Sequence, residues 1–354
     1  MNLVINESQP LWEYLRCAEK PVVLYGMGEG ALKILAVCRQ YGIPIAGIFA
    51  SDEFVRGHSF EGYPVESLAQ IEERLGDFIV LLCFGVDYDS MLERIAELSR
   101  RHETYAPDIP VFGSDLFTPE YFREHQAEFE QVYGLLADDE SRQIYADLLA
   151  YKLSGKLEYL YRHMGSREED FGSILTPGPG SVYVDLGAYD GDTVEEFIRH
   201  CPDYGWIWAL EPDPKNFRKL QAAAGELPRT TLVPKGSYSG EGELTFSARG
   251  GRNSALAESG KKLRPVELTS VDALLQGNRA DYIKMDVEGV ERETLLGCRE
   301  TIARWKPQLS VAAYHRTGDL WELPLLVREL GPDYRLYLRR HKYVPAWEII
   351  LYAV

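Results

Sequence analysis

The sequence predicts an α/β protein of two domains, and three observations support this prediction. Short apolar runs with the length of buried strands alternate with stretches whose apolar residues recur at helical spacing. A glycine-containing turn follows such a run twice, at residues 26–31 and 187–193. With 354 residues, of which 45% are hydrophobic, the chain can bury two cores. Alternating strands and helices are typical of parallel sheets covered by helices on both faces.

The first domain is predicted to span residues 1–117. A helix within residues 1–20 is indicated by Leu11, Trp12 and Leu15. Further elements are expected as strands at 21–25, 43–49, 78–84 and 110–112 and as helices at 31–39 and near 65–75. The turn at 26–31 fits G-x-G-x-x-A, with Asp52 about 20 residues further on. This pattern either binds a nucleotide or packs a strand closely against a helix. The lack of Lys or Arg in the turn favours packing.

Residues 118–175 are predicted to be a helical connector. Apolar residues between Ile144 and Leu149 follow the i, i+3, i+4 pattern, and Asp138, Asp139 and Ser141 are possible helix caps before them. The Ser154-Gly155 pair should interrupt the helical run. The Pro- and Gly-rich segment 176–180 marks the start of the second domain, predicted at residues 176–354.

The second domain is predicted to be a mostly parallel, Rossmann-like sheet with a closing antiparallel hairpin. Core strands are expected at residues 182–186, 206–210, 230–234, 280–286 and 308–313. An additional pair is expected near 243–247 and 266–268, and the closing hairpin at 334–338 and 347–352.

The turn after the first strand of this domain is rich in acidic residues. Asp185, Asp190 and Asp192 would repel a diphosphate, whereas they suit a ligand with a cationic centre and an amino group. Glu211 ends the next strand, about 20 residues after Gly187, and can accept hydrogen bonds from both hydroxyls of a ribose. These features predict a site for S-adenosylmethionine. The alternative is an ordinary α/β turn with solvated acids.

A second motif spans residues 282–297. Asp286 and Glu288 follow a strand whose carboxyl end should meet the same sheet edge as Asp185. Carboxylates that converge there would raise one another's pKa unless a cation or hydrogen-bond donors intervene. That cation is either the sulfonium or a metal ion. Alternatively, Asp286 and Glu288 simply stabilise the start of a helix.

A candidate general base, His315, follows the next strand. The ordinary pKa of histidine suits proton transfer near neutral pH. We therefore take His315, Glu288 and Asp286 as catalytic candidates. For His315 the alternative is a structural hydrogen bond at a strand end. Asp286 would equally hold the amino group of the methionine moiety or a divalent ion.

Residues 181–354 resemble the FkbM-type family of S-adenosylmethionine-dependent methyltransferases. The segments that carry the resemblance are VDLGAYDGDT, ALEPDP, IKMDVEGVERETLLG, KPQLSVAAYH and YRLYLRRH with EIILYA. The resemblance implies O-methylation of a hydroxyl on a sugar, glycan precursor or secondary metabolite. It also implies contacts to the methyl donor from Asp185, Gly187, Ala188 and Glu211. Tyr189 departs from the Asn that is frequent in the family.

The expected site for the methyl donor extends beyond these residues. We add Gly191, Asp192 and Thr193 from the same turn, and Asp286 from the second motif. No residue is assigned as a metal ligand, and dependence on a divalent cation is left open.

Composition narrows the expected partners. The net charge is −17, and residues 1–170 hold 15 Lys and Arg against 30 Asp and Glu, so binding to nucleic acid is not expected. No apolar run reaches the length of about 20 residues that spans a membrane, and the start of the chain lacks the features of a secretory signal. Together with five scattered cysteines, an odd count, these features predict a cytoplasmic protein that acts on a small-molecule or carbohydrate acceptor.

The sequence also allows alternative functions. One is a nucleotide- or NAD-dependent oxidoreductase, or a nucleotide-sugar binding protein, that uses the N-terminal domain. Another is a protein that binds S-adenosylmethionine without turnover. The aromatic-rich connector could supply an interface between copies of the chain, as in a homo-oligomer.

Overall fold

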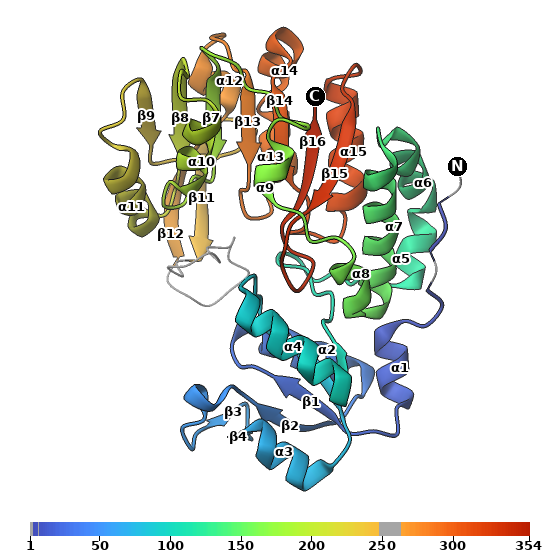
Figure 1. Cartoon of the computed structure of the whole chain (residues 1–354). Coiled ribbons are helices and arrows are strands. Elements are labelled where there is room, and N and C mark those ends of the chain that lie inside the picture. The colour runs from blue at the N-terminus through green and yellow to red at the C-terminus, as the bar shows by residue number, and fades with distance from the viewer. Residues whose placement is uncertain (1–2, 6, 248–262) are drawn as a thin grey trace.

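The computed structural model describes residues 3–5, 7–247 and 263–354 and has two α/β domains with helices packed beside them (Figure 1). The N-terminal domain forms the lower part of the view and the C-terminal domain the upper part. The predicted fold class is confirmed: both main sheets are mostly parallel and flanked by helices. Among the described helices, none has the length and apolar character needed to cross a membrane.

The N-terminal sheet has the strand order β3-β4-β2-β1-β5-β6 within the described residues. Its strands are β1 (Val22–Tyr25), β2 (Ile45–Phe49), β3 (Ser59–Phe60), β4 (Tyr63–Glu66), β5 (Ile79–Leu82) and β6 (Glu103–Tyr105). Its helices are α1 (Leu11–Cys17), α2 (Glu29–Tyr41), the 3-10 helix η1 (Asp52–Phe54), α3 (Leu68–Leu75) and α4 (Asp89–Arg101). All pairs except β3 with β4 are parallel.

Two expectations for this domain are wrong. The helix expected near residues 65–75 begins only at Leu68, because Val65 belongs to β4 and Ser67 caps the helix in a reciprocal arrangement with Gln70. The segment 110–112 is not a strand, and β6 takes the place beside β5 instead. Segment 110–112 crosses to the other domain, where the Phe112 N–H donates a hydrogen bond of 2.9 Å to the carbonyl of His315.

The connector consists of α5 (Pro119–Glu124), α6 (Gln126–Leu135), α7 (Asp139–Ser154), α8 (Leu157–Tyr161) and α9 (Arg167–Asp170). Asp138 caps α7 by accepting a hydrogen bond of 2.8 Å from the Ser141 N–H. Gly155, with a φ of 64°, ends the helix where an interruption was expected. The buried Tyr145 donates a hydrogen bond to the Leu320 carbonyl, so α7 packs into the C-terminal core.

The C-terminal sheet has the strand order β15-β16-β14-β13-β7-β8-β9 in the described part of the chain. These strands are β7 (Val182–Leu186), β8 (Trp206–Leu210), β9 (Thr230–Val233), β13 (Tyr282–Met285), β14 (Gln308–Ala312), β15 (Leu336–Arg340) and β16 (Ile349–Ala353). Only β16 runs antiparallel to its neighbours, which confirms the closing hairpin. A small separate sheet holds β10 (Gly236–Ser237), β11 (Gly242–Ser247) and β12 (Leu263–Thr269).

Six helices belong to the described part of the C-terminal domain. They are α10 (Asp192–His200), α11 (Pro214–Ala224), α12 (Val271–Leu275), α13 (Glu291–Leu296), α14 (Arg299–Trp305) and α15 (Asp319–Leu330). The additional pair expected near 243–247 and 266–268 exists as β11 and β12, which pair with each other in the small sheet.

Direct contacts join the two domains. Val86, just after β5, exchanges two backbone hydrogen bonds with Val344, of 2.8 and 2.9 Å. Lys342 forms an ion pair of 2.9 Å with Asp89 at the start of α4. Together with the bond between Phe112 and His315, these contacts hold the N-terminal domain against the carboxyl ends of the C-terminal strands.

We expect Gly30→Ala to lower the free energy of unfolding by about 2 kcal/mol. A Cβ at Gly30 would lie 2.2 Å from the Cys83 carbonyl oxygen, so α2 would have to move away from the end of β5. Urea unfolding monitored by circular dichroism measures the loss. The control is Gly134→Ala in α6, where nothing lies within 4 Å and where alanine should be neutral or stabilise by up to about 1 kcal/mol. Equal stability of the two variants would contradict the packing interpretation of the turn.

Candidate active site

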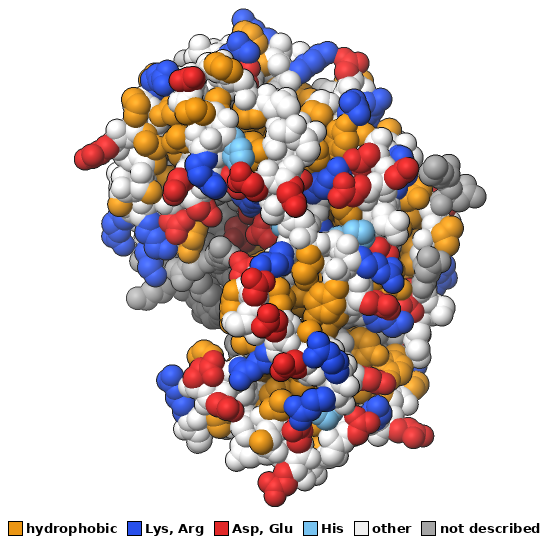
Figure 2. Space-filling model, in the orientation of Figure 1, with side chains coloured by type: hydrophobic (Ala, Val, Ile, Leu, Met, Phe, Trp, Pro, Cys, Tyr) orange, Lys and Arg blue, Asp and Glu red, His pale blue; other side chains and the backbone are white. Residues whose placement is uncertain are grey.

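A cavity of about 560 Å³ lies between the two domains. The N-terminal side of its lining comes from the turn at 26–31, the end of β5 and the segment 107–112. The C-terminal side comes from the carboxyl ends of β7, β8, β13 and β14 and from the loop before β16. Figure 2 shows the hollow between the domains, with acidic side chains gathered near it.

One end of the cavity is formed by the turn after β7. Gly187 has a φ of 82°, and a Cβ there would lie only 1.9 Å from the Asp286 carbonyl oxygen, so only glycine allows this approach of the two turns. Glu211 lies at the end of β8 and is only 6% exposed. Its carboxylate accepts hydrogen bonds from the N–H groups of Tyr189 (3.0 Å) and Asp213 (2.8 Å). Burial raises the pKa of Glu211 to about 7, although these two bonds act to lower it.

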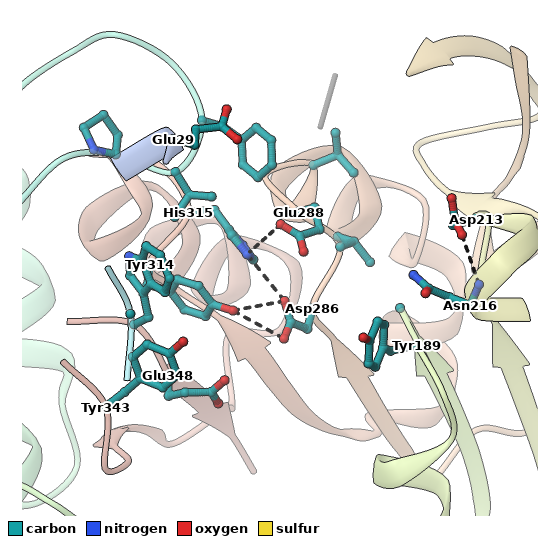
Figure 3. Close-up of a pocket in the computed structure, with 18 of the residues that line it drawn as sticks. Glu29, Tyr189, Asp213, Asn216, Asp286, Glu288, Tyr314, His315, Tyr343 and Glu348 are labelled. Atoms are coloured by element: carbon teal, nitrogen blue, oxygen red, sulfur yellow. Dashed lines mark hydrogen bonds and ion pairs between the residues drawn. The ribbon is translucent and has the colours of Figure 1, made fainter. Parts of the chain in front are cut away.

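The centre of the cavity holds a cluster of acids around His315. Figure 3 shows Asp286 and Glu288 pointing toward the imidazole from the turn after β13. The His315 Nε2 atom lies 3.5 Å from Asp286 Oδ1 and 3.6 Å from Glu288 Oε2, and Nδ1 lies 2.8 Å from Glu291 Oε1. The Tyr314 hydroxyl donates to both oxygens of Asp286 at 3.4 Å.

The members of this cluster differ in how their pKa values are shifted. Burial acts to lower the pKa of His315, but the charges of Glu291, Asp286 and Glu288 outweigh it and raise the value to about 10. Burial acts to raise the pKa of Asp286, yet His315, Lys284 and Arg167 hold it below its usual value. For Glu288, burial is the main cause of a pKa raised to about 8. At neutral pH the cluster therefore holds a cationic His315, an ionised Asp286 and a Glu288 that is mostly protonated.

The chain was compared with known protein families and solved structures. Residues 185–345 match the family model of the methyltransferase FkbM domain. This segment is therefore similar to FkbM-type methyltransferase domains. The match confirms the family resemblance that the sequence motifs carry, and it covers both motifs that line the cavity.

Two solved structures are similar to this chain, and the first of them shares its fold. Methyltransferase FkbM from Methylobacillus flagellatus has a TM-score of 0.75 at 20% identity and covers 95% of this chain and 90% of that chain. Precorrin-6y C5,15-methyltransferase from Geobacter metallireducens has a TM-score of 0.35 at 13% identity, covering 53% of this chain and 86% of that chain. The comparison with curated proteins finds no match.

Asp185 was expected to contact a methyl donor directly, but it does not line the cavity. Asp185 is fully buried. Its carboxylate lies 3.2 Å from the Lys284 ammonium and accepts a hydrogen bond of 2.5 Å from the Thr193 hydroxyl. Lys284 also donates to the Gly187 carbonyl at 2.8 Å. Asp185 thus stabilises the Gly187 turn from the protein interior, whereas Thr193 and Lys284 line the cavity.

The other expected residues of the turn divide into two groups. Ala188 is completely buried and Gly191, with a φ of 97°, begins α10; neither lines the cavity. They shape the backbone behind the ligand surface. Gly187 and Asp192 do line it, and Asp192 is exposed there.

The catalytic candidates come together, but the charge of one differs from expectation. Asp286, Glu288 and His315 all line the cavity. His315 was expected to have an ordinary pKa, whereas the neighbouring carboxylates keep it protonated at neutral pH. Asp185 was expected to converge with Asp286 and Glu288, but Lys284 lies between it and the cavity.

Sequence reasoning missed Lys284, Glu291 and Tyr314. A lysine within the apolar run of β13 is a signal that could have been used, because a buried ammonium needs a nearby acid. Nothing in the sequence signals Glu291, whose contact with His315 depends on how α13 packs against the end of β14. Tyr314 lies directly before His315 and gives no separate signal.

Asp286, Glu291 and His315 are the one group of possible metal ligands found among the described residues, with donor atoms within 4.8 Å of one another. However, Glu291 faces Nδ1 of the imidazole while Asp286 faces Nε2. A protonated ring therefore bridges the acids and balances their charge, so the geometry does not require an ion.

We expect Lys284→Met to lower the free energy of unfolding by about 3 kcal/mol, because it leaves the buried Asp185 without its partner. Burial acts to lower the pKa of Lys284, but Asp185 and Asp286 raise it, so the ammonium is charged. Urea unfolding measures the loss. Adding Asp185→Asn should recover part of it. Lys306→Met, which breaks the exposed pair with Asp333, is the control and should stay within about 0.5 kcal/mol of the parent. Similar losses for Lys284→Met and Lys306→Met would contradict this account.

Proposed function

We propose that this protein is an S-adenosylmethionine-dependent methyltransferase that methylates a hydroxyl of a sugar, glycan precursor or secondary metabolite. The observation that carries the proposal is one cavity that joins Glu211 and the Gly187 turn to the cluster of Asp286, Glu288 and His315. The first part suits a nucleoside and the second suits a proton transfer beside a cationic centre. Further parts of the proposal are a cytoplasmic location and a small-molecule or carbohydrate acceptor rather than nucleic acid.

Glu211 would hold the ribose of the donor. Its two backbone bonds orient the carboxylate, and each oxygen keeps lone-pair capacity for a ribose hydroxyl. Gly187 lets the donor approach the backbone, and Tyr189, Asp213 and Asn216 lie at the same end of the cavity (Figure 3). The donor supplies a methyl group on a sulfonium leaving group, and the ionised Asp286 provides negative charge toward that cation.

Glu288 is the best-matched general base. An acid whose pKa lies near the working pH accepts a proton effectively and still ionises. Glu288 reaches the cavity, and a bound sulfonium would favour its carboxylate form. His315 already carries a proton, so we propose that its positive charge balances the negative charge of Asp286 and of ionised Glu288. The Tyr314 hydroxyl would keep Asp286 oriented.

A nucleotide-binding function of the N-terminal turn is a second candidate, because Met27, Glu29 and Gly30 line the same cavity. The close packing of Gly30 on Cys83 already explains one glycine of the turn. The turn carries Glu29 and no basic residue, which disfavours a diphosphate. We therefore keep the methyltransferase as the proposed function of the whole cavity.

We expect affinity for S-adenosylhomocysteine to fall up to about tenfold for each pH unit below 7. Glu211 can accept hydrogen bonds from two ribose hydroxyls only in its ionised form. Its pKa in the free protein is about 7, so protonation of Glu211 at lower pH weakens binding. Calorimetry between pH 5.5 and 8 measures the dependence. Glu211→Gln should bind weakly at every pH and lose this slope, whereas Glu267→Gln, an exposed change, should behave as the parent. A slope that survives in Glu211→Gln would contradict the assignment.

We expect Glu288→Gln to lower turnover on an identified acceptor by about 10²- to 10⁴-fold, because it removes the base. The parent rate should rise with pH toward the pKa of Glu288, about 8 in the free protein, since the carboxylate is the active form. Methyl transfer from labelled donor measures both effects. The exposed control Glu226→Gln should keep the parent rate and profile. Near-normal turnover of Glu288→Gln with normal donor binding would show that alignment alone suffices.

A further inference from the structure

We propose that the N-terminal domain forms one wall of the acceptor site and that the acceptor presents the apolar face of a six-membered ring to Tyr343 and Trp347. This inference rests on the proposed function and adds where the acceptor binds and which chemical class it belongs to. Its basis is the part of the cavity that the donor would leave free.

The donor and acceptor ends lie on opposite sides of the central cluster. In Figure 3, Tyr189, Asp213 and Asn216 lie on one side of Asp286 and Glu288, and Tyr343 and Glu348 lie on the other. A donor held by Glu211 occupies the first side. The space beyond Glu288 is therefore where an acceptor hydroxyl can face both the donor and the base.

Both domains line this second side. Phe84 and Gly85 come from the end of β5, and Tyr343 and Trp347 come from the loop before β16. The backbone bonds between Val86 and Val344 hold the two segments together. The acceptor wall is thus assembled across the domain boundary before any ligand binds.

Tyr343 and Trp347 form a paired aromatic surface. Their ring centroids are 5.5 Å apart with an angle of 31° between the planes, and both residues line the cavity while half-buried. The rings rest directly on Gly85, where a Cβ would lie 2.6 Å from a Trp347 ring carbon and 2.7 Å from the Tyr343 ring. Any side chain at Gly85 would push these rings out of place.

Polar groups border the aromatic surface. Glu348 lines the cavity next to it and forms an ion pair of 3.2 Å with Arg167, which orients its carboxylate. The Tyr314 hydroxyl and Glu29 of α2 line neighbouring parts of the wall. Aromatic faces beside convergent oxygens suit a ring with an apolar face and hydroxyls at its edge. A pyranose and a phenol share this chemistry.

The site itself allows a test that is independent of turnover. Methyl β-D-glucopyranoside and catechol serve as probes of the two ring types, titrated in the presence of saturating S-adenosylhomocysteine and followed by saturation-transfer NMR. We expect saturable binding of at least one probe to the parent protein. Gly85→Ala and Trp347→Ala should each weaken it at least about fivefold. Their affinity for S-adenosylhomocysteine should stay within about twofold of the parent.

Gly85→Ala would displace the rings of Trp347 and Tyr343, and the three atoms nearest to its Cβ all belong to these side chains and not to the backbone, so we expect its effect to stay local. Gly134→Ala, with nothing within 4 Å, is the matched control and should bind the probe as the parent does. Absence of saturable binding for both probes, or binding that neither Gly85→Ala nor Trp347→Ala weakens, would overturn the inference. Failure of the parent to bind S-adenosylhomocysteine would instead overturn the proposed function. Which probe binds distinguishes a sugar from a phenol.

Discussion

The buried ion pair between Lys284 and Asp185 is the interaction on which the cavity depends. It links neighbouring strands β13 and β7, and the same ammonium donates to the Gly187 carbonyl. The Gly187 turn in turn lies against the Asp286 carbonyl, at a distance that only glycine permits. The buried Lys284 ammonium thus fixes the positions of both motif turns relative to each other. The positions of the proposed donor site and of the cluster around His315 follow from that arrangement.

The proposed proton transfer depends on how charge is distributed among the neighbouring acids of the central cluster. Asp286 and Glu288 are two residues apart, yet the pKa of Asp286 lies below its usual value and that of Glu288 is raised to about 8. Asp286 faces His315, Lys284 and Arg167, whereas burial dominates at Glu288. Paired acids with separated pKa values are what acid–base chemistry at neutral pH requires. In the proposed mechanism, the protonated His315 therefore serves as a fixed charge and not as the base.

The N-terminal domain also has a glycine turn after its first strand, but we propose that this domain shapes the acceptor site and does not bind the donor. Its glycine turn is explained in part by close packing at Gly30, and its loops reach the other domain through Val86 and Phe112. The shared fold with the Methylobacillus flagellatus protein spans both domains. An arrangement in which one domain binds the donor and the other helps to shape the acceptor wall is consistent with a cavity that both domains line.

Sequence alone determined the α/β class, most core strands and the turns that carry Glu211, Asp286 and Glu288. These features depend on residues close together in the chain, since burial patterns and glycine turns are local. Only the tertiary structure decided that Lys284 neutralises Asp185, that Glu291 holds His315 protonated, and that segment 110–112 crosses to the other domain. The physical reason is that the charge state of a buried group is set by neighbours on other strands and helices, and no local pattern specifies which of them it meets.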